Sequence, residues 1–115
     1  MENENKKYEL ILAIVNKGST DLVMNAARAA GSKGGTITGA RGTGNPELAK
    51  FYGIVIQPEK EIVFIVVESE IKDKAIKKIY DDAGIGTKGQ GIIISLPITD
   101  AIGLTPLVKE EEKSE

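Results

Sequence analysis

The sequence predicts an α+β domain of the ferredoxin-like class: order βαββαβ, a four-stranded antiparallel sheet, and two helices on one face. Short apolar, strand-like runs alternate with two stretches whose apolar residues recur at helical spacing. The chain has 115 residues, of which 41% are hydrophobic and 28% charged, enough for one domain with one core. In the split βαβ arrangement that this order indicates, right-handed crossovers place both helices on the same face of the sheet.

The first strand and helix are predicted from an abrupt change of period. Residues 8–15 form a β-rich run that ends at Asn16-Lys-Gly18. Ser19 or Thr20 can cap the helix that follows, and Gly31 stands where its C-terminal cap is expected. Its apolar positions are Leu22, Val23, Ala26, Ala27 and Ala30.

The second and third strands flank a segment rich in glycine. Residues 36–38 alternate as a strand and run into the first glycine cluster. Residues 54–67 are again strand-like, and Gln57-Pro-Glu-Lys60 interrupts them as a turn or bend.

The second helix and the last strand complete the order. Ser69 is expected to cap a helix that stops near Gly84, before the strand of residues 92–98. The apolar face of this helix would use Ile71, Ala75, Ile76, Ile79 and Tyr80.

A single domain, residues 1–115, is therefore expected, with residues 1–6 and 109–115 frayed because they are charged and poor in apolar residues. The N-terminus is charged, and the longest aliphatic stretches are too short to span a bilayer. We expect a cytoplasmic protein with no direct membrane insertion.

Charge and composition exclude several classes of function. A net charge of -2 disfavours a general nucleic-acid binder. The chain has neither Cys nor His, which removes thiol nucleophiles, His-based triads and the usual zinc ligands. Asp81-Asp82 has no evident basic or nucleophilic partner. We therefore expect no catalytic residues, no metal site and no enzyme.

One face of the predicted sheet lacks a cover. The first and third strands are nearly continuous in apolar residues, as in strands buried on both faces, yet only two helices are available. A second subunit would cover the open face by symmetric closure. The alternative is that these residues are simply exposed, because folded proteins retain much apolar surface.

Two glycine-rich segments, residues 34–44 and 84–91, each carry a basic residue and hydroxyls beside a strand. Glycine permits positive φ and close approach of the main chain, and successive N–H groups in such turns form a nest suited to phosphate. The competing interpretation is that these glycines serve tight turns and helix caps, which is the common role of glycine in a small domain.

These features together resemble the PII nitrogen-regulatory signal-transduction family across residues 8–104. The family's Gly-then-Thr strand is matched by Gly34-Gly-Thr36, its flexible T-loop by residues 41–53, and its Val-Val pair by Val66-Val67. Its glycine-rich turn before the last strand is matched by Ile85-Gly-Thr-Lys-Gly-Gln-Gly91.

The resemblance implies a homotrimer that binds an adenine nucleotide, as an effector and not a cofactor, in clefts between subunits. It further implies that the loop signals to a partner enzyme or membrane transporter. The ligand-binding residues carried over by similarity are Ile14, Thr36 and Val66 at the base, Gly42 and Gly44 at the loop, Gly86, Gly89 and Gly91 at the phosphate side, and the cations Arg41 and Lys88.

Within the loop, Asn45, Phe51 and Tyr52 are the expected partner contacts. Phe51 and Tyr52 have a second interpretation as a hydrophobic anchor. Arg41 and Lys88 have one as solvated surface cations.

The chain departs from the family pattern where phosphate charge is neutralised. Gly103 and Thr105 stand where the family carries a pair of arginines, and Ile92 replaces a lysine. We therefore expect a ligand with less phosphate charge than ATP, such as AMP, ADP, or a cyclic or adenosyl compound. Tyr52 falls near, and not on, the tyrosine that some members have modified, so no modification is carried over.

Three classes of function follow. The first is a nucleotide-responsive regulatory trimer. The second is a trimeric scaffold of the same fold that binds its partner without ligand. The third and weakest is a metal-dependent phosphate-ester enzyme, against which the missing Walker pattern argues.

Overall fold

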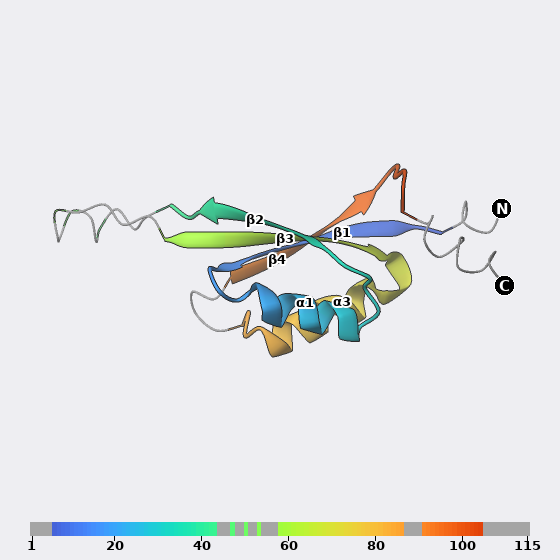
Figure 1. Cartoon of the computed structure of the whole chain (residues 1–115), viewed down its shortest axis with the longest axis horizontal. Coiled ribbons are helices and arrows are strands. Elements are labelled where there is room, and N and C mark those ends of the chain that lie inside the picture. The colour runs from blue at the N-terminus through green and yellow to red at the C-terminus, as the bar shows by residue number, and fades with distance from the viewer. Residues whose placement is uncertain are drawn as a thin grey trace.

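The computed structural model describes residues 6–43, 47, 50, 53, 58–86 and 91–104. Its elements run in the predicted βαββαβ order (Figure 1). They are β1 (Tyr8–Asn16), α1 (Thr20–Ala29), β2 (Thr36–Arg41), β3 (Glu59–Glu68), α3 (Ser69–Asp82) and β4 (Gly91–Ile98).

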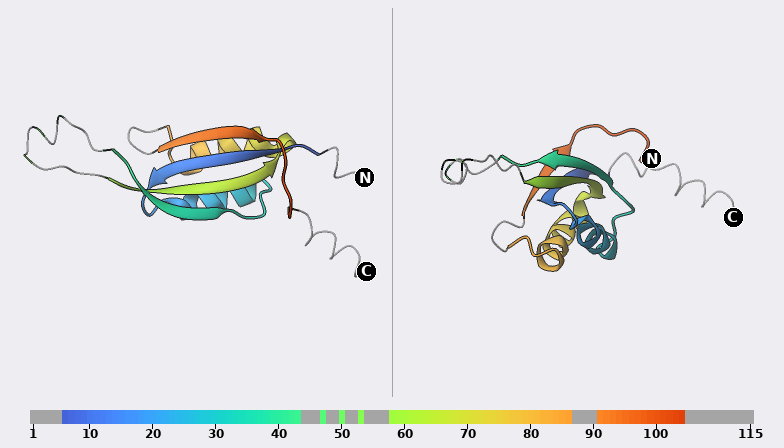
Figure 2. Two further views of the ribbon diagram at one scale, coloured as in Figure 1. Left: turned by 90° about the horizontal axis from the view of Figure 1, so that it is seen from above. Right: turned by 60° about the vertical axis from the view of Figure 1, so that its left-hand side comes forward.

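The four strands form one antiparallel sheet in the order β2-β3-β1-β4, which confirms the predicted fold class. The central pair runs from Tyr8 opposite Glu68 to Asn16 opposite Lys60. Both helices lie against the same face of the sheet, and the opposite face carries no element among the described residues (Figure 2).

The core lies between the sheet and the helices. Successive side chains of a strand point to opposite faces, so alternate residues of β1 and β3 face the helices. The fully buried members from the strands are Ile11, Ala13, Val15, Val63 and Ile65. Val23, Ala26 and Ala27 of α1 and Ala75 and Ile79 of α3 pack against them, and small alanines let the helices approach closely.

Two helix-face predictions were wrong. Leu22 is 48% exposed and Tyr80 is 51% exposed. Each lies next in sequence to a buried residue, Val23 or Ile79. Adjacent residues of a helix point in different directions, so only one of each pair can face the core. The buried stripe of each helix is therefore narrower than predicted.

Glycine ends both helices, as the sequence predicts. Gly31 has φ of +116°, its N–H donates to the Arg28 carbonyl at 3.0 Å, and the Ser32 N–H donates to the Ala27 carbonyl at 3.0 Å. This pair of bonds is the Schellman motif. Gly84 has φ of +69° after α3 and serves the same purpose.

The helix starts differ from the prediction in detail. Ser19 is the N-cap residue of α1, but its hydroxyl makes no capping hydrogen bond. Its φ of -101° and ψ of 3° are not the extended values that direct a cap side chain at the first turn. At α3 the N-cap is Glu68, and Ser69 is the first helical residue.

The strand bounds correct one prediction. Glu59 and Lys60 belong to β3 and are not part of a turn, because they pair with Arg41 and Ala40 of a β2 that is longer than expected. Pro58, which lacks an N–H, precedes the strand. Gln57 and residues 54–56 lie outside the described residues.

Lys6, at the edge of the segment predicted to fray, donates to the Glu68 carboxylate at 3.2 Å. The other predicted terminal segments lie outside the described residues. Within the described ranges, none of the helices has the length and apolar character needed to cross a membrane.

Candidate functional site

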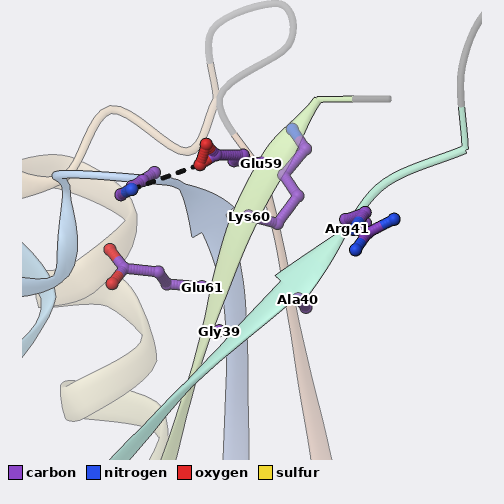
Figure 3. Close-up of a pocket in the computed structure, with 7 residues that line it drawn as sticks. Gly39, Ala40, Arg41, Glu59, Lys60 and Glu61 are labelled. Atoms are coloured by element: carbon purple, nitrogen blue, oxygen red, sulfur yellow. Dashed lines mark hydrogen bonds and ion pairs between the residues drawn. The ribbon is translucent and has the colours of Figure 1, made fainter. Parts of the chain in front are cut away.

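A shallow groove of about 540 Å³ lies where β2 ends and β3 begins (Figure 3). It is open to solvent and lined by charged side chains and the end of β2. The lining residues are Lys17, Gly39, Ala40, Arg41, Glu59, Lys60 and Glu61.

Strand geometry sets the direction of these side chains. Arg41 is the last residue of β2 and stands opposite Glu59, the first residue of β3. Because side chains alternate along a strand, Glu59 and Glu61 share one face and Lys60 takes the other. Figure 3 shows Glu59 and Glu61 pointing to the same side of β3, away from Lys60.

The groove carries three cations and two carboxylates, so its lining has a net positive charge. Lys17 Nζ lies 3.2 Å from Glu59 Oε2, and the Gly18 N–H donates to Glu61 Oε1 at 2.9 Å. Lys60 Nζ donates to Asn16 Oδ1 at 2.6 Å. The exposed Lys17–Glu59 ion pair holds its side chains only weakly, so an anionic group can enter and compete for Lys17. The groove is suited to binding an anion.

The first glycine cluster is extended and is not a nest in its described part. None of Gly34, Gly35, Gly39 and Gly42 has a positive φ. A Cβ on Gly35 would lie 2.9 Å from both Met24 Sδ and the Phe64 carbonyl oxygen, so the absence of a side chain lets the chain pass between α1 and β3. The Gly42 N–H donates to the Pro58 carbonyl at 2.7 Å and continues the β2–β3 pairing.

In the second glycine cluster, residues 84–91, each glycine that the structure describes is explained by the fold. A Cβ on Gly86 would collide with the Tyr80 hydroxyl. Gly91 has φ of +145°, and a Cβ there would collide with the Ile14 carbonyl oxygen. The pairing of β4 with β1 therefore requires glycine at position 91 and brings it against Ile14.

The sequence-predicted ligand residues in or beside the strands fall into two groups on one chain, and Gly86 lies apart from them, after α3. Arg41, Gly42, Gly91 and Ile14 lie at the end of the sheet where the groove is. Thr36 lies opposite Phe64, and Val66 lies two residues further along β3, both toward the opposite end.

The separation between the groups is large for a single small ligand. Ile14 stands opposite Ile62, so Val66 is four residues away along β3, a span of roughly 13 Å at the usual strand rise. Ile14, Thr36 and Val66 nevertheless share the face of the sheet opposite the helices. The predicted contacts at Gly44, Lys88 and Gly89, and at Asn45, Phe51 and Tyr52, lie outside the described residues.

Sequence reasoning missed most of the groove's charged lining. Lys17, Glu59, Lys60 and Glu61 were not among the predicted site residues, and Glu59 and Lys60 were assigned to a turn. The available signal was the alternation of Glu59, Lys60 and Glu61 directly before an apolar strand, which is typical of a strand end that reaches solvent.

The described ranges contain no group of three or more Asp or Glu residues placed to hold a metal ion. The two carboxylates at the end of α3 instead pair with lysines one turn earlier, Asp81 with Lys77 at 3.2 Å and Asp82 with Lys78 at 3.3 Å.

The sequence matches the family model described as nitrogen regulatory protein P-II over residues 8–106. Among solved structures, the chain is similar to Arabidopsis thaliana PII bound to citrate, with 26% sequence identity and a TM-score of 0.68. That match covers 88% of this chain and 86% of the Arabidopsis chain. No curated protein matches the sequence.

Proposed function

This chain belongs to the PII nitrogen-regulatory family, and from that premise we propose that it is a signalling trimer that binds a small adenine nucleotide or related adenosyl ligand between its subunits. PII proteins are regulators and not enzymes, in agreement with the prediction from composition. They are typically trimeric and bind effectors.

The observation that carries the proposal is the open face of the sheet. We define it by the residues of β1, β3 and β4 that point away from the helices: Leu10, Leu12, Ile14, Ile62, Phe64, Val66, Ile92, Ile94 and Leu96. On β4, Ile92 is 53% exposed, Ile94 is 40% exposed and Leu96 is 44% exposed. A continuous apolar layer of this kind favours association with further copies of the chain, and closed symmetry satisfies every copy.

Association on this face also supports a ligand position between subunits. Ile14, Gly91 and Arg41 lie at one end of the chain's sheet, and Thr36 and Val66 lie toward the other. One subunit can therefore supply the first group and its neighbour the second. Such a cleft would form only in the oligomer.

The ligand class follows from charge. The groove beside Arg41 has an excess of one positive charge in its lining, which fits a modest anionic group better than a triphosphate. Gly103, at the position of a family arginine, has no side chain to add charge. We propose AMP, ADP, or a cyclic or adenosyl compound. Because the Arabidopsis relative was solved with citrate, a polycarboxylate belongs among the compounds to be tested.

The segment between β2 and β3 is the proposed signalling element. It joins two strands at the groove, so a ligand there lies at the base of the segment. Through this segment the trimer would regulate a cytoplasmic enzyme or the cytoplasmic side of a transporter. The second class, a scaffold that needs no ligand, is separated from this proposal by the experiment that follows.

The test is a thermal-shift panel with ATP, ADP, AMP, cyclic AMP, cyclic di-AMP, S-adenosylmethionine and citrate. A ligand at 100 times its Kd stabilises the folded protein by about 2.7 kcal/mol, a shift of several degrees. We expect a selective shift with a ligand less charged than ATP. Arg41→Gln should reduce the shift, and Lys74→Gln, a change of equal charge at an exposed position of α3, should not. A flat panel on a folded oligomer would favour the scaffold.

A further inference from the structure

The turn between β1 and α1 lies directly against the first residues of β3. The Ser19 N–H donates to the Asn16 carbonyl at 3.1 Å, which closes a four-residue turn. Gly18, its third residue, has φ of +98°, as a type II turn requires. No atom lies within 4 Å of a Cβ built on Gly18, so the glycine serves the backbone conformation and not a close approach.

Each of the first three residues of β3 is held by this turn. The Lys17 N–H donates to the Glu59 carbonyl at 3.3 Å, and the Lys17 ammonium donates to the Glu59 carboxylate at 3.2 Å. Lys60 Nζ donates to the Asn16 side chain at 2.6 Å. The Gly18 N–H donates to the Glu61 carboxylate at 2.9 Å.

These contacts reach β3 from both faces of the sheet. Glu59 and Glu61 are on the helix side and Lys60 on the open side (Figure 3). On the other edge, β3 is held near its start by β2, through pairing that ends with the Gly42 N–H on the Pro58 carbonyl. A two-stranded ribbon alone is weakly stable, so support from β1 decides whether its end stays closed.

We propose that the β1–α1 turn is a clamp for the stem of the segment between β2 and β3, with Asn16, Lys17, Glu59, Lys60 and Glu61 as its positioning residues. The clamp keeps the end of the β2–β3 ribbon closed and so fixes the two points from which the segment leaves the sheet. It couples the stem to the start of α1, because only the N-cap residue Ser19 separates Gly18 from the first turn of that helix. The clamp itself does not depend on the proposed function. A role for it in partner binding would depend on the proposal that this segment contacts a partner.

The test is hydrogen exchange at the Gly42 amide, because its bond to Pro58 reports opening of the stem. In Glu61→Ala, the Gly18 N–H loses its acceptor and the stem opens more often. We expect the exchange rate of the Gly42 amide to rise about fivefold to tenfold, because the loss of one ordinary hydrogen bond makes local opening more favourable by about that factor. The core amides of Ile11 and Ile65 should keep wild-type protection.

Two variants sharpen the result. Glu61→Gln keeps an oxygen acceptor for Gly18 and should restore slow exchange at Gly42. Glu68→Ala removes a carboxylate at the other end of β3, where it pairs with Lys6, and should leave Gly42 unchanged. If Gly42 exchange stays at the wild-type rate in Glu61→Ala, or rises equally in Glu61→Gln, the clamp is wrong; a rise shared equally by the core amides also refutes it.

The measurement uses the protein without nucleotide or partner. A flat ligand panel would therefore leave the clamp standing, and a failed exchange result would leave the ligand proposal standing.

Discussion

Gly91→Ala would add a side chain where both the backbone conformation and close packing exclude one. Gly91 has φ of +145°, which L side chains rarely adopt, and an added Cβ would collide with the Ile14 carbonyl oxygen of the neighbouring strand. Backbone strain of this kind costs about 1–3 kcal/mol. Forcing atoms into a packed site costs a further 1–3 kcal/mol or so. The smaller entropy of the unfolded alanine chain offsets only about 0.4–1 kcal/mol.

We therefore expect Gly91→Ala to lower the free energy of unfolding by roughly 1–6 kcal/mol. The assay is urea denaturation followed by far-ultraviolet circular dichroism, with protein concentration held fixed because oligomerisation contributes to apparent stability. Gly39→Ala is the matched control, because φ is not positive there and a Cβ would meet no atom within 4 Å. It should change stability by less than about 0.5 kcal/mol. Equal stability of the two variants would refute the argument that strand pairing requires Gly91.

Three further predictions concern other parts of the fold. Gly86→Ala should lower the free energy of unfolding by less than about 1 kcal/mol in the same denaturation assay. The atom that an added Cβ would meet is the end of the half-exposed Tyr80 side chain, which can move. A loss as large as that of Gly91→Ala would contradict this. Ile65→Ala, at a fully buried position, should cost about 2–5 kcal/mol, and a loss below 1 kcal/mol would show that the core can collapse around it. Phe64→Glu, on the open face, should shift the oligomer toward monomer in sedimentation velocity, whereas Lys74→Glu on the solvent side of α3 should not; an intact oligomer in the Phe64 variant would exclude this face as the interface.

The order and type of the elements could be predicted because each has a strong periodic pattern with a glycine or proline at its boundary. The helix ends at Gly31 and Gly84 are examples, since a left-handed residue after a helix is a local requirement visible in the sequence. The open face was also predictable, because residues 10–15 of β1 and residues 62–67 of β3 are all apolar and the chain has too few helices to cover both sides.

The charged groove could not be predicted in the same way, because its contacts join residues far apart in sequence. Lys17 meets Glu59, and Asn16 meets Lys60, through the antiparallel register of β1 on β3. The sequence offered a turn signal at Pro58, but the chain pairs with β2 from the next residue, Glu59. The structural role of Gly91 was also not visible in the sequence. Its place in a glycine-rich pattern predicted phosphate binding, whereas the structure shows that close pairing with Ile14 requires a glycine there.

Native mass spectrometry of the full chain, titrated with ADP and in parallel with AMP, would show whether each ligand site needs two subunits. Our account predicts a trimer that takes up as many as three ligands, with no ligand on the monomer, because each site is completed by two subunits. Ligand bound to the monomer would contradict a site between subunits. A protein that stays monomeric would contradict the trimer itself.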